Sequence, residues 1–275
     1  MKETIFFNGK FISAQEAKVS VFSPGLLYGW GLFETMRSYN HRILYLEAHL
    51  RRIRESCRLL QIKFNYPADK LKKAIKEAVK LNALKDACVR LNIWKNAEGK
   101  TDICITAKRY NPPSVKKYKQ GFSCQVCGLR QNENSFLSRI KSTNYLFPQL
   151  AYLEAKKKGF DEAIILNNAG YLAEASRANL FMVKNNELFT PSLGCGCLDG
   201  ITRRVVGDLA KKNALRLREG NFTLQNLYAA DEAFLTNSLM GIMPLKAVEH
   251  IPLGKGREIT RLLSSKYNLL LKNGS

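Results

Sequence analysis

The 275-residue sequence lacks any apolar run that is long enough to cross a membrane. A transmembrane helix needs about 18–20 consecutive apolar residues, and no segment of this chain approaches that length. The opening residues, MKETIFFNGKFI, hold no apolar core of the length of a secretory signal and alternate like a strand instead. We therefore expect a cytoplasmic protein that does not associate with membranes.

Histidine is scarce, and the seven cysteines form an odd, scattered set. Such a set fits a reducing compartment better than a disulfide framework. Cys124 and Cys127 lie in a strand-like run that would point their side chains in opposite directions. Cys195 and Cys197 lie in a glycine loop with no histidine nearby. We expect buried free thiols and no metal site.

Acidic residues are also few, with 23 Asp and Glu against 44 Lys and Arg, so that the formal net charge is +21. A basic surface attracts polyanions such as nucleic acids. Nucleic-acid-binding modules, however, combine clustered basic residues with interleaved aromatic residues or a reading helix. The lysines here are spread over predicted helix faces, as in 70–80 and 156–158. We expect no nucleic-acid partner.

The hydrophobic share of 45% and the charged share of 24% are those of a globular protein. Residue periodicity and turn signals predict strands at 4–12, 32–39, 88–94 and 102–110, a loop at 22–30, and helices at 46–61 and 67–82 in the first half. The second half shows a strand-like run at 122–129, strands at 162–166, 171–173, 179–183 and 187–190, and helices at 144–158, 201–213, 223–228 and 256–271.

This mixture of strands and helices predicts an α+β fold with two domains. We expect a smaller N-terminal α/β domain at 1–120, an interdomain linker at 121–135, where a polar run interrupts the pattern, and a larger C-terminal domain at 136–275. We find no internal repeat and no low-complexity segment.

A single lysine, Lys141, precedes the residues Ser142, Thr143 and Asn144, which are typical helix caps. The partial positive charge of a helix N-terminus disfavours a nearby ammonium group, so a buried lysine there would lose its proton more easily. A neutral amine is what a lysine nucleophile needs to form an imine with a carbonyl. The same pattern also fits a surface lysine in a capping loop.

The segment LAEASRANLF at 172–181 places polar residues, among them Glu174, Ser176 and Arg177, between two apolar strand runs. Strands that lead into and out of such a cluster can hold a carboxylate rigidly against a basic ring nitrogen. A polar hairpin turn without a ligand would show the same pattern.

The segment LDGITR at 198–203 is a glycine turn that opens a helix. The N–H groups of Ile201 and Thr202 and the threonine hydroxyl would form a cradle for a phosphate at the helix N-terminus. Many helices begin in this way without binding a ligand, so this segment alone does not decide a function.

Considered together, these segments resemble the signature of the class IV aminotransferases. These fold-type IV pyridoxal-phosphate enzymes include branched-chain and D-amino-acid aminotransferases and aminodeoxychorismate lyases. The matching positions occur in order: Glu174-x-Ser176-x-x-Asn179-Leu180-Phe181, Leu188-x-Thr190 and Leu198-x-Gly200-Ile201-x-Arg203. Three further segments resemble other motifs of the family: Tyr28-Gly29-x-Gly31-Leu32-Phe33-Glu34-Thr35-x-Arg37, His49-Leu50-x-Arg52-Ile53-x-x-Ser56 and Lys141-x-x-Asn144-Tyr145-Leu146.

The resemblance covers essentially the whole chain and implies a D-amino-acid-aminotransferase-like fold with the active site between the two domains. It implies that the C-terminal domain binds pyridoxal 5′-phosphate. Lys141 matches the lysine that forms an imine with the cofactor and later moves the α-proton. Glu174 matches the carboxylate that pairs with the pyridine nitrogen and keeps it protonated, so that the ring accepts electrons as the Cα–H bond breaks.

The remaining cofactor contacts are also implied by the resemblance. The phosphate-binding positions are Arg52, Ile201, Thr202 and Ser238. The positions on the side of the ring hydroxyl are Tyr145 and Arg177. Helical periodicity alone does not single out Arg52, because it lies about 120° from the centre of the apolar stripe of its helix.

The substrate is less well defined by the resemblance. Branched-chain enzymes carry a small-residue GTA loop where this chain has Asn237-Ser238-Leu239, and the run at 236–244 is more similar to the loop of aminodeoxychorismate lyases. The arginine-x-histidine carboxylate trap of the D-amino-acid enzymes is absent, because the strand at 90–95 contains no histidine. The candidate substrate residues are Tyr28, Phe33, Arg37, Arg90 and Leu239, with Arg37 or Arg90 as the carboxylate partner.

Two reactions remain open. We expect an aminotransferase that moves an amino group between an amino acid and a 2-oxo acid, because most of the family are transaminases. The alternative is an aminodeoxychorismate lyase, which releases pyruvate and leaves 4-aminobenzoate for folate synthesis. The resemblance also implies a homodimer in which the loop around Tyr28 reaches the active site of the neighbouring subunit.

Overall fold

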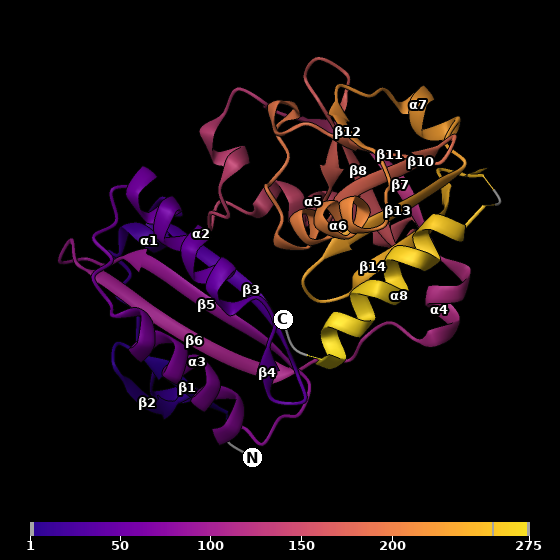
Figure 1. The fold of residues 1–275 in the computed structure, drawn as a ribbon. Coiled ribbons are helices and arrows are strands. Elements are labelled where there is room, and N and C mark those ends of the chain that lie inside the picture. Colours follow the sequence, from indigo (N-terminus) through magenta and orange to yellow (C-terminus); the bar gives the residue numbers. More distant parts are fainter. Residues whose placement is uncertain (1–2, 255, 274–275) are drawn as a thin grey trace. The chain divides into compact units, whose positions relative to one another are not determined.

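The computed structural model describes residues 3–254 and 256–273 (Figure 1). The chain divides into two compact units. The first unit contains the residues up to Asn111 together with Ile140–Asn144, and the second contains Pro112–Arg139 and Tyr145–Asn273. Residues 1–2, 255 and 274–275, which fall in the two expected domains, lie outside the described residues.

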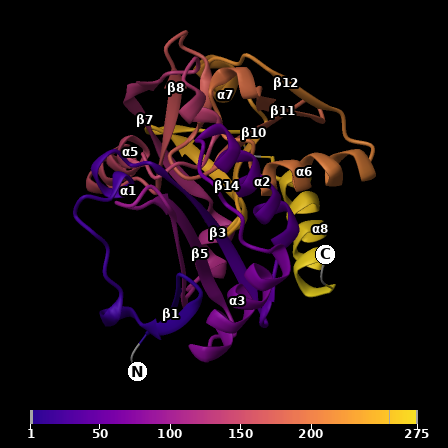
Figure 2. The ribbon, with the colours of Figure 1, turned by 90° about the vertical axis from the view of Figure 1, so that its left-hand side faces the viewer.

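The first unit is built on an antiparallel sheet in the order β2-β1-β6-β5-β3-β4 (Figures 1 and 2). Its strands are β1 (Thr4–Phe7), β2 (Lys10–Ser13), β3 (Gly31–Tyr39), β4 (Arg42–Ile43), β5 (Ala87–Lys95) and β6 (Thr101–Arg109). Its helices are α1 (Pro24–Leu27), α2 (Leu46–Leu59) and α3 (Ala68–Leu81). Alternation along the strands gives this sheet one apolar face.

The register places the buried residues of neighbouring strands side by side. Leu32 of β3 lies opposite Ile93 of β5, which lies opposite Ile103 of β6. All three side chains are buried, and the long helices α2 and α3 contact the strands of this sheet. Apolar residues recur at helical spacing in both helices, and most of them are buried: Leu46, Leu50, Ile53 and Cys57 in α2, and Leu71, Ile75, Ala78 and Val79 in α3. Leu60, the last residue of the predicted stripe of α2, lies at the C-cap of this helix and is partly exposed.

Two local predictions in this unit differ from the structure. The strand expected at 4–12 is a hairpin of β1 and β2, because Asn8 and Gly9 form the turn with φ values of 46° and 94°. Glycine tolerates this left-handed backbone, and asparagine accepts it more readily than most residues. The loop expected at 22–30 contains the short helix α1, which has Pro24 at its first position.

The second unit contains a mixed sheet in the order β12-β11-β10-β13-β14-β7-β8-β9, with β15 paired to β14. Its strands are β7 (Phe122–Gln131), β8 (Glu162–Asn167), β9 (Leu172–Ala175), β10 (Asn179–Lys184), β11 (Glu187–Pro191), β12 (Leu217–Gly220), β13 (Glu232–Asn237), β14 (Gly241–Val248) and β15 (Ile251–Pro252). Its helices are α4 (Val115–Gln120), α5 (Leu146–Lys157), α6 (Ile201–Lys212), α7 (Leu224–Tyr228) and α8 (Glu258–Asn273).

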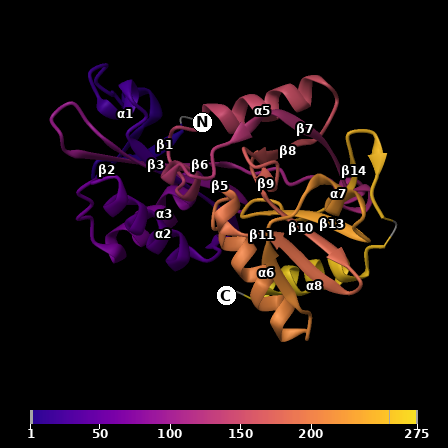
Figure 3. The same ribbon diagram turned by 90° about the horizontal axis from the view of Figure 1, so that it is seen from above.

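Helices cover this sheet in two groups. Helix α5 packs against β7 and β8, whereas α6 and α8 lie side by side and contact β13 (Figure 3). Within 3–254 and 256–273, none of the helices has both the length and the apolar character that a membrane span requires. The chain has the expected α+β fold.

The expected interdomain linker at 121–135 differs from the structure, because most of it is strand β7. This strand pairs in parallel with both β14 and β8. Its two cysteines, Cys124 and Cys127, belong to different apolar clusters, in agreement with the prediction that they face opposite ways, and both thiols are free. Buried side chains on both of its faces make this segment part of the core. The polypeptide passes from one unit to the other after Asn111 and around the segment Ile140–Asn144.

Candidate active site

Lys141 belongs to the first unit, although the sequence suggested the C-terminal domain. Its carbonyl accepts a hydrogen bond from the Phe33 N–H at 2.9 Å, and the Thr143 N–H donates to the Gly31 carbonyl at 2.9 Å. The segment around Lys141 therefore extends along one edge of β3. Helix α5 begins only at Leu146, so Lys141 lies in extended backbone before the first helical turn rather than at the helix cap.

The Phe33 ring contacts two cations of the first unit. The Lys141 Nζ atom lies 4.5 Å from the ring centroid, and the Arg90 Cζ atom lies 3.8 Å from it. Both distances are those of cation–π contacts. The Arg90 Nε–H also donates to the Asn92 Oδ1 atom at 3.1 Å, and Asn92 lies opposite Phe33 across the β3–β5 pair. The candidate nucleophile Lys141 and the candidate carboxylate partner Arg90 thus contact the same ring.

Arg52 is held by a buried carboxylate. Its Nε–H donates to Glu34 Oε1 at 2.7 Å and its Nη2–H to Glu34 Oε2 at 2.6 Å. The His49 Nδ1 atom lies 2.7 Å from Glu34 Oε2. Burial alone would raise the pKa of Glu34, but Arg52 and His49 outweigh this effect and lower the pKa to about 2. Burial lowers the pKa of His49, although Glu34 opposes this shift. Glu34 therefore fixes the orientation of the Arg52 guanidinium.

Arg37 has a different environment from Arg90. Its Nε–H and Nη2–H donate to the two carboxylate oxygens of Asp86 at 3.1 and 2.8 Å. The guanidinium also lies over the rings of Tyr39 and Tyr110, at 5.5 and 5.0 Å from their centroids. Tyr28 lies at the end of α1 and is largely exposed. Of the two candidate carboxylate partners, Arg90 is the one that shares a ring contact with the candidate nucleophile.

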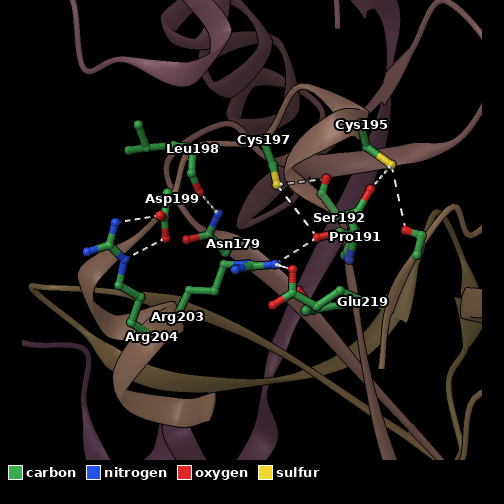
Figure 4. Close-up of polar contacts among 12 residues, drawn as sticks. Asn179, Pro191, Ser192, Cys195, Cys197, Leu198, Asp199, Arg203, Arg204 and Glu219 are labelled. Carbon is green, nitrogen blue, oxygen red and sulfur yellow. Dashed lines mark hydrogen bonds and ion pairs between the residues drawn. The ribbon is translucent and has the colours of Figure 1, made fainter. Parts of the chain in front are cut away.

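Glu174 lies in β9 next to the turn at 175–178 that leads into β10. Its Oε2 atom accepts hydrogen bonds from Asn179 Nδ2 at 3.2 Å and from the Leu198 N–H at 3.1 Å. Asn179 Nδ2 also donates to the Leu198 carbonyl at 2.8 Å (Figure 4). Asn179 therefore ties the turn to the segment before α6 and holds Glu174 in a defined orientation.

Gly200 caps α6, and the free N–H groups of this helix begin at Ile201 and Thr202. A Cβ atom at Gly200 would overlap with the Asn179 Oδ1 atom. Only glycine can therefore bring the start of the helix this close to the Asn179 side chain. Ile201 and Thr202 are buried in the first turn, where the helix dipole and the N–H groups favour an anion.

Two arginines fix the position of this helix start (Figure 4). The buried Arg203 donates to the Pro191 carbonyl at 3.1 Å and forms an ion pair with Glu219 at 2.8 Å. Arg204 Nε donates to Asp199 Oδ1 at 2.9 Å. The arginine of the LDGITR segment thus anchors α6 to the end of β11.

The turn at 175–178 also contacts the segments that carry the other candidate residues of the second unit. The Tyr145 hydroxyl donates to the Ser176 carbonyl at 2.8 Å. Asn237 Nδ2 donates to the Arg177 carbonyl at 3.0 Å, directly before the loop at 238–240. The Arg177 guanidinium lies 3.3 Å from the centroid of the Tyr152 ring.

One residue beneath this turn was not among the candidate site residues, although it lies in the segment Gly159-x-Asp161-Glu162-Ala163, which resembles a motif of the family. Glu162 is buried at the start of β8, where its carboxylate accepts hydrogen bonds from the Ser176 hydroxyl and, at 2.9 Å, from the Ala163 N–H. Arg177 Nε lies 3.4 Å from its second oxygen. Burial raises the pKa of Glu162, although Arg177 opposes this shift. An acidic residue at the head of an apolar run was the available sequence signal.

The thiols of Cys195 and Cys197, near the start of α6, contact polar atoms of neighbouring loops. Cys195 Sγ lies 3.2 Å from Asn221 Oδ1, and Cys197 Sγ lies 3.4 Å from the Ser192 carbonyl (Figure 4). Burial raises the pKa of Cys197 well above the ordinary value of a thiol, which makes it unreactive at neutral pH. In the part of the chain that the structure describes, no group of His, Cys, Asp and Glu side chains is arranged to hold a metal ion.

The candidate residues thus form separate groups within the two units. The first unit contains Lys141, Arg52, Tyr28, Phe33, Arg37 and Arg90, and the second contains Glu174, Ile201, Thr202, Ser238, Tyr145, Arg177 and Leu239. In the first unit, Lys141 and Arg90 both contact the Phe33 ring. In the second, the turn at 175–178 and the residues bonded to it bring the candidates together.

The sequence is similar to the sequences of known proteins over nearly its full length. A match to the family described as amino-transferase class IV spans residues 31–248. An aminodeoxychorismate lyase of Bacillus subtilis is 34% identical, with 98% of this chain and 95% of the relative aligned. A branched-chain-amino-acid aminotransferase of Pseudomonas aeruginosa is 30% identical, with 96% and 91% aligned. A solved branched-chain amino acid aminotransferase with pyridoxamine 5′-phosphate, from the organism abbreviated T.th., superposes with a TM-score of 0.91 at 28% identity and covers 98% of this chain and 94% of its own.

Proposed function

The chain belongs to the class IV aminotransferase family, and we propose that it transfers an amino group between an amino acid and a 2-oxo acid with pyridoxal 5′-phosphate as its cofactor. The solved relative with pyridoxamine 5′-phosphate supports this cofactor. The observation that carries the proposal is the orientation of Glu174 by Asn179 and Leu198, directly beside the glycine-capped start of α6.

The residues of the second unit fit a phosphorylated pyridine. A pyridinium nitrogen needs a carboxylate whose orientation is fixed, which two N–H donors provide at Glu174. A phosphate needs N–H donors and hydroxyl groups, which the start of α6 offers at Ile201 and Thr202. Only a glycine at position 200 lets this helix start so close to Asn179.

Further residues would complete the phosphate and ring contacts. Arg52 would supply a guanidinium to the phosphate, in the orientation that Glu34 imposes. Ser238 would add a hydroxyl to the phosphate. Tyr145 and Arg177 would contact the side of the ring hydroxyl, since both are held at the turn beside Glu174.

When bound, pyridoxal phosphate supplies a ring that accepts the electron pair of the breaking Cα–H bond. Glu174 would stabilise that charge by holding a proton at the pyridine nitrogen. The Lys141 Nζ atom would take the proton from the substrate Cα as a general base. The Phe33 ring, which contacts Lys141, would limit the directions in which the lysine side chain can move.

Arg90 is the proposed partner of the substrate carboxylate. Asn92 occupies its Nε–H, and the Phe33 ring supports the plane of the guanidinium. A guanidinium held in this way presents a fork that matches a carboxylate. Tyr28 and Leu239 remain proposed substrate contacts. Arg37 is the second choice for the carboxylate, because its guanidinium lies over Tyr39 and Tyr110 and not over the ring that Lys141 contacts.

An aminodeoxychorismate lyase is the second candidate function. The loop Asn237-Ser238-Leu239 differs from the small-residue loop of branched-chain enzymes, and the Bacillus subtilis lyase is 34% identical. This enzyme would release pyruvate from aminodeoxychorismate and leave 4-aminobenzoate. Both reactions would use the same lysine and the same carboxylate, so the two functions differ in the substrate and in the fate of the electron pair.

We also propose a homodimer. An apolar segment around α1 is unusually exposed, with side chains that are 55–75% accessible: Val21, Phe22, Leu26, Leu27 and Tyr28. Clustered exposed apolar residues are typical of interfaces with another protein, and symmetric homodimers are the commonest assemblies. Sedimentation of the purified chain at micromolar concentration tests this proposal, and a monomer would contradict it.

Spectroscopy tests the cofactor and the reaction together. The purified protein should be yellow, and the Lys141→Ala variant should lose the visible absorbance. Addition of D-alanine, L-leucine or L-glutamate should remove the absorbance and release the corresponding 2-oxo acid. If no amino donor acts but aminodeoxychorismate yields pyruvate, the lyase is correct. A protein that takes up no pyridoxal phosphate would exclude both functions.

A further inference from the structure

Asn237 makes three hydrogen bonds through one side chain at the hairpin between β13 and β14. Its Oδ1 atom accepts from the Leu239 N–H at 3.0 Å and from the Met240 N–H at 2.9 Å. Its Nδ2 atom donates to the Arg177 carbonyl at 3.0 Å. The first two bonds stay within the loop at 238–240, whereas the third reaches the turn between β9 and β10.

The loop at 238–240 is fixed at both ends. Asn237 holds its beginning, since its side-chain oxygen accepts from two backbone N–H groups of the loop. Gly241 ends it with a φ of 70°, and a Cβ atom there would lie 2.8 Å from the Tyr267 ring. A residue other than glycine would therefore meet both backbone strain and a steric clash. Ser238 lies between these two fixed points.

The third bond connects this loop to the turn that follows Glu174. The same turn is held from below by Glu162 and receives the Tyr145 hydroxyl. A glycine or alanine at position 237 would leave both the Arg177 carbonyl and the loop N–H groups without the bonds that Asn237 makes. The amide of Asn237 thus bonds the loop to the turn, next to the end of the β10–β13 pair.

We propose that Asn237 is a positioning residue that holds Ser238 at the phosphate of the cofactor by locking the 238–240 loop to the turn beside Glu174. This inference rests on the proposed function, because the phosphate belongs to pyridoxal 5′-phosphate. A rigid cofactor contacted at its ring by Glu174 and at its phosphate by Ser238 requires a fixed separation between the two segments. The Asn237 side chain bonds to the loop that carries Ser238 and to the turn that follows Glu174.

The test compares two ligands that differ only in the phosphate. The full-length chain, freed of cofactor, is titrated with pyridoxal 5′-phosphate and with pyridoxal, and the two dissociation constants are measured by absorbance. Asn237→Ala should weaken the binding of pyridoxal phosphate about tenfold, which corresponds to about 1.4 kcal/mol, because the loop that carries Ser238 loses its bond to the turn. The affinity for pyridoxal should change by less than about twofold.

A second variant separates the two kinds of bond. Asn237→Ser keeps a hydroxyl oxygen that can accept from the loop N–H groups, but this shorter side chain does not reach the Arg177 carbonyl and adds no charge near the phosphate. It should therefore show a smaller loss of pyridoxal phosphate affinity than Asn237→Ala. If the alanine variant does not fold, the serine variant decides the question by the same ratio of the two dissociation constants.

Asn96→Ala is the matched control. Asn96 accepts from the Glu98 and Lys100 N–H groups at 3.1 and 2.9 Å in the β5–β6 hairpin, which carries no candidate residue in its loop. This variant should bind both ligands like the wild type. The proposal is wrong if the Asn237 variants bind pyridoxal phosphate like the wild type, or if both ligands weaken equally. A wild-type chain that binds neither ligand would instead refute the proposed function.

Discussion

Replacement of Glu34 by glutamine tests how the first unit holds Arg52. The carboxylate is 1% exposed and accepts hydrogen bonds from both Arg52 and His49 within 2.7 Å. Glu34→Gln keeps the shape of the side chain but removes its charge. The Arg52 guanidinium, which is 9% exposed, would then lose its carboxylate partner inside the fold. Breaking a buried pair in this way is strongly destabilising.

The pKa of Glu34 gives the size of the effect. Each pKa unit corresponds to about 1.4 kcal/mol, so a fall from the ordinary 4.5 to about 2 corresponds to about 3 kcal/mol of stability. Because the pKa is lowered in the folded protein, this stability is fully present above pH 4.5 and is lost as the pH falls towards about 2. Glu34→Gln should remove both the stability and this part of its pH dependence.

Urea unfolding between pH 7 and pH 3 measures both quantities. The free energy of unfolding of the variant should be lower by about 3 kcal/mol at pH 7, and the difference from the wild type should shrink below pH 4.5. Glu47→Gln is the control, because Glu47 lies in α2 with Arg52 but is exposed and pairs with Lys72 on the surface. Its effect should stay within about 0.5 kcal/mol. A Glu34→Gln variant as stable as the wild type at pH 7 would refute the reasoning.

Three further variants probe other parts of the structure. Burial raises the pKa of Glu162, so the stability that its protonated form contributes is lost as the pH rises above 4.5. Glu162→Gln should therefore make the free energy of unfolding less dependent on pH in this range, and an unchanged pH dependence would contradict this. Gly200→Ala should destabilise the protein by about 1–3 kcal/mol in thermal unfolding and weaken pyridoxal phosphate binding, because its Cβ would meet Asn179; unchanged affinity would argue against the close approach. Arg37→Ala should cost about 2 kcal/mol, and a double-mutant cycle with Asp86→Ala should show coupling; additive effects would exclude the pair.

The long amphipathic elements of the first unit could be predicted from the sequence because their signal is local. The stripe of α3, with Leu71 and Ile75, repeats at the helical period and is buried as expected. Strands β3 and β5 were also predicted to within one residue at each end, and in β5 buried apolar residues alternate with partly exposed ones. Such patterns depend only on which face of an element meets the core.

Several strands of the second unit escaped prediction because their environment is set by distant segments. Strand β7 was taken in part for a linker, and β13 and β14 were not assigned. Strands β13 and β14 are buried on both faces or nearly so, so their residues do not alternate between apolar and polar. A continuous apolar run does not distinguish a strand from a loop or a helix without its neighbours.

The candidate site also combines residues that a local pattern indicates with residues whose environment is set by distant segments. The residue patterns around Lys141 and Glu174 also fitted a capping loop and a hairpin turn, and only the family signature favoured a site. The helix after Lys141 was expected to begin at residue 144, whereas α5 begins at Leu146. Arg52 lay outside the apolar stripe, yet it is buried because Glu34 of another element neutralises it. Partners that are far apart in the sequence decide such cases, and a single sequence does not reveal those pairs.

The charges show why the composition predicted so little of the chemistry. The net charge of +21 counts every residue equally, whereas an interaction between charges is several times stronger inside a protein than at its surface. Glu34 pairs with Arg52, and Glu232 accepts from the N–H groups at the start of α8. Both carboxylates are buried and support the structure. The excess of lysines on exposed helix faces can attract anions over long distances, but it is the few buried charges and their partners that make a site specific for a phosphate or a carboxylate.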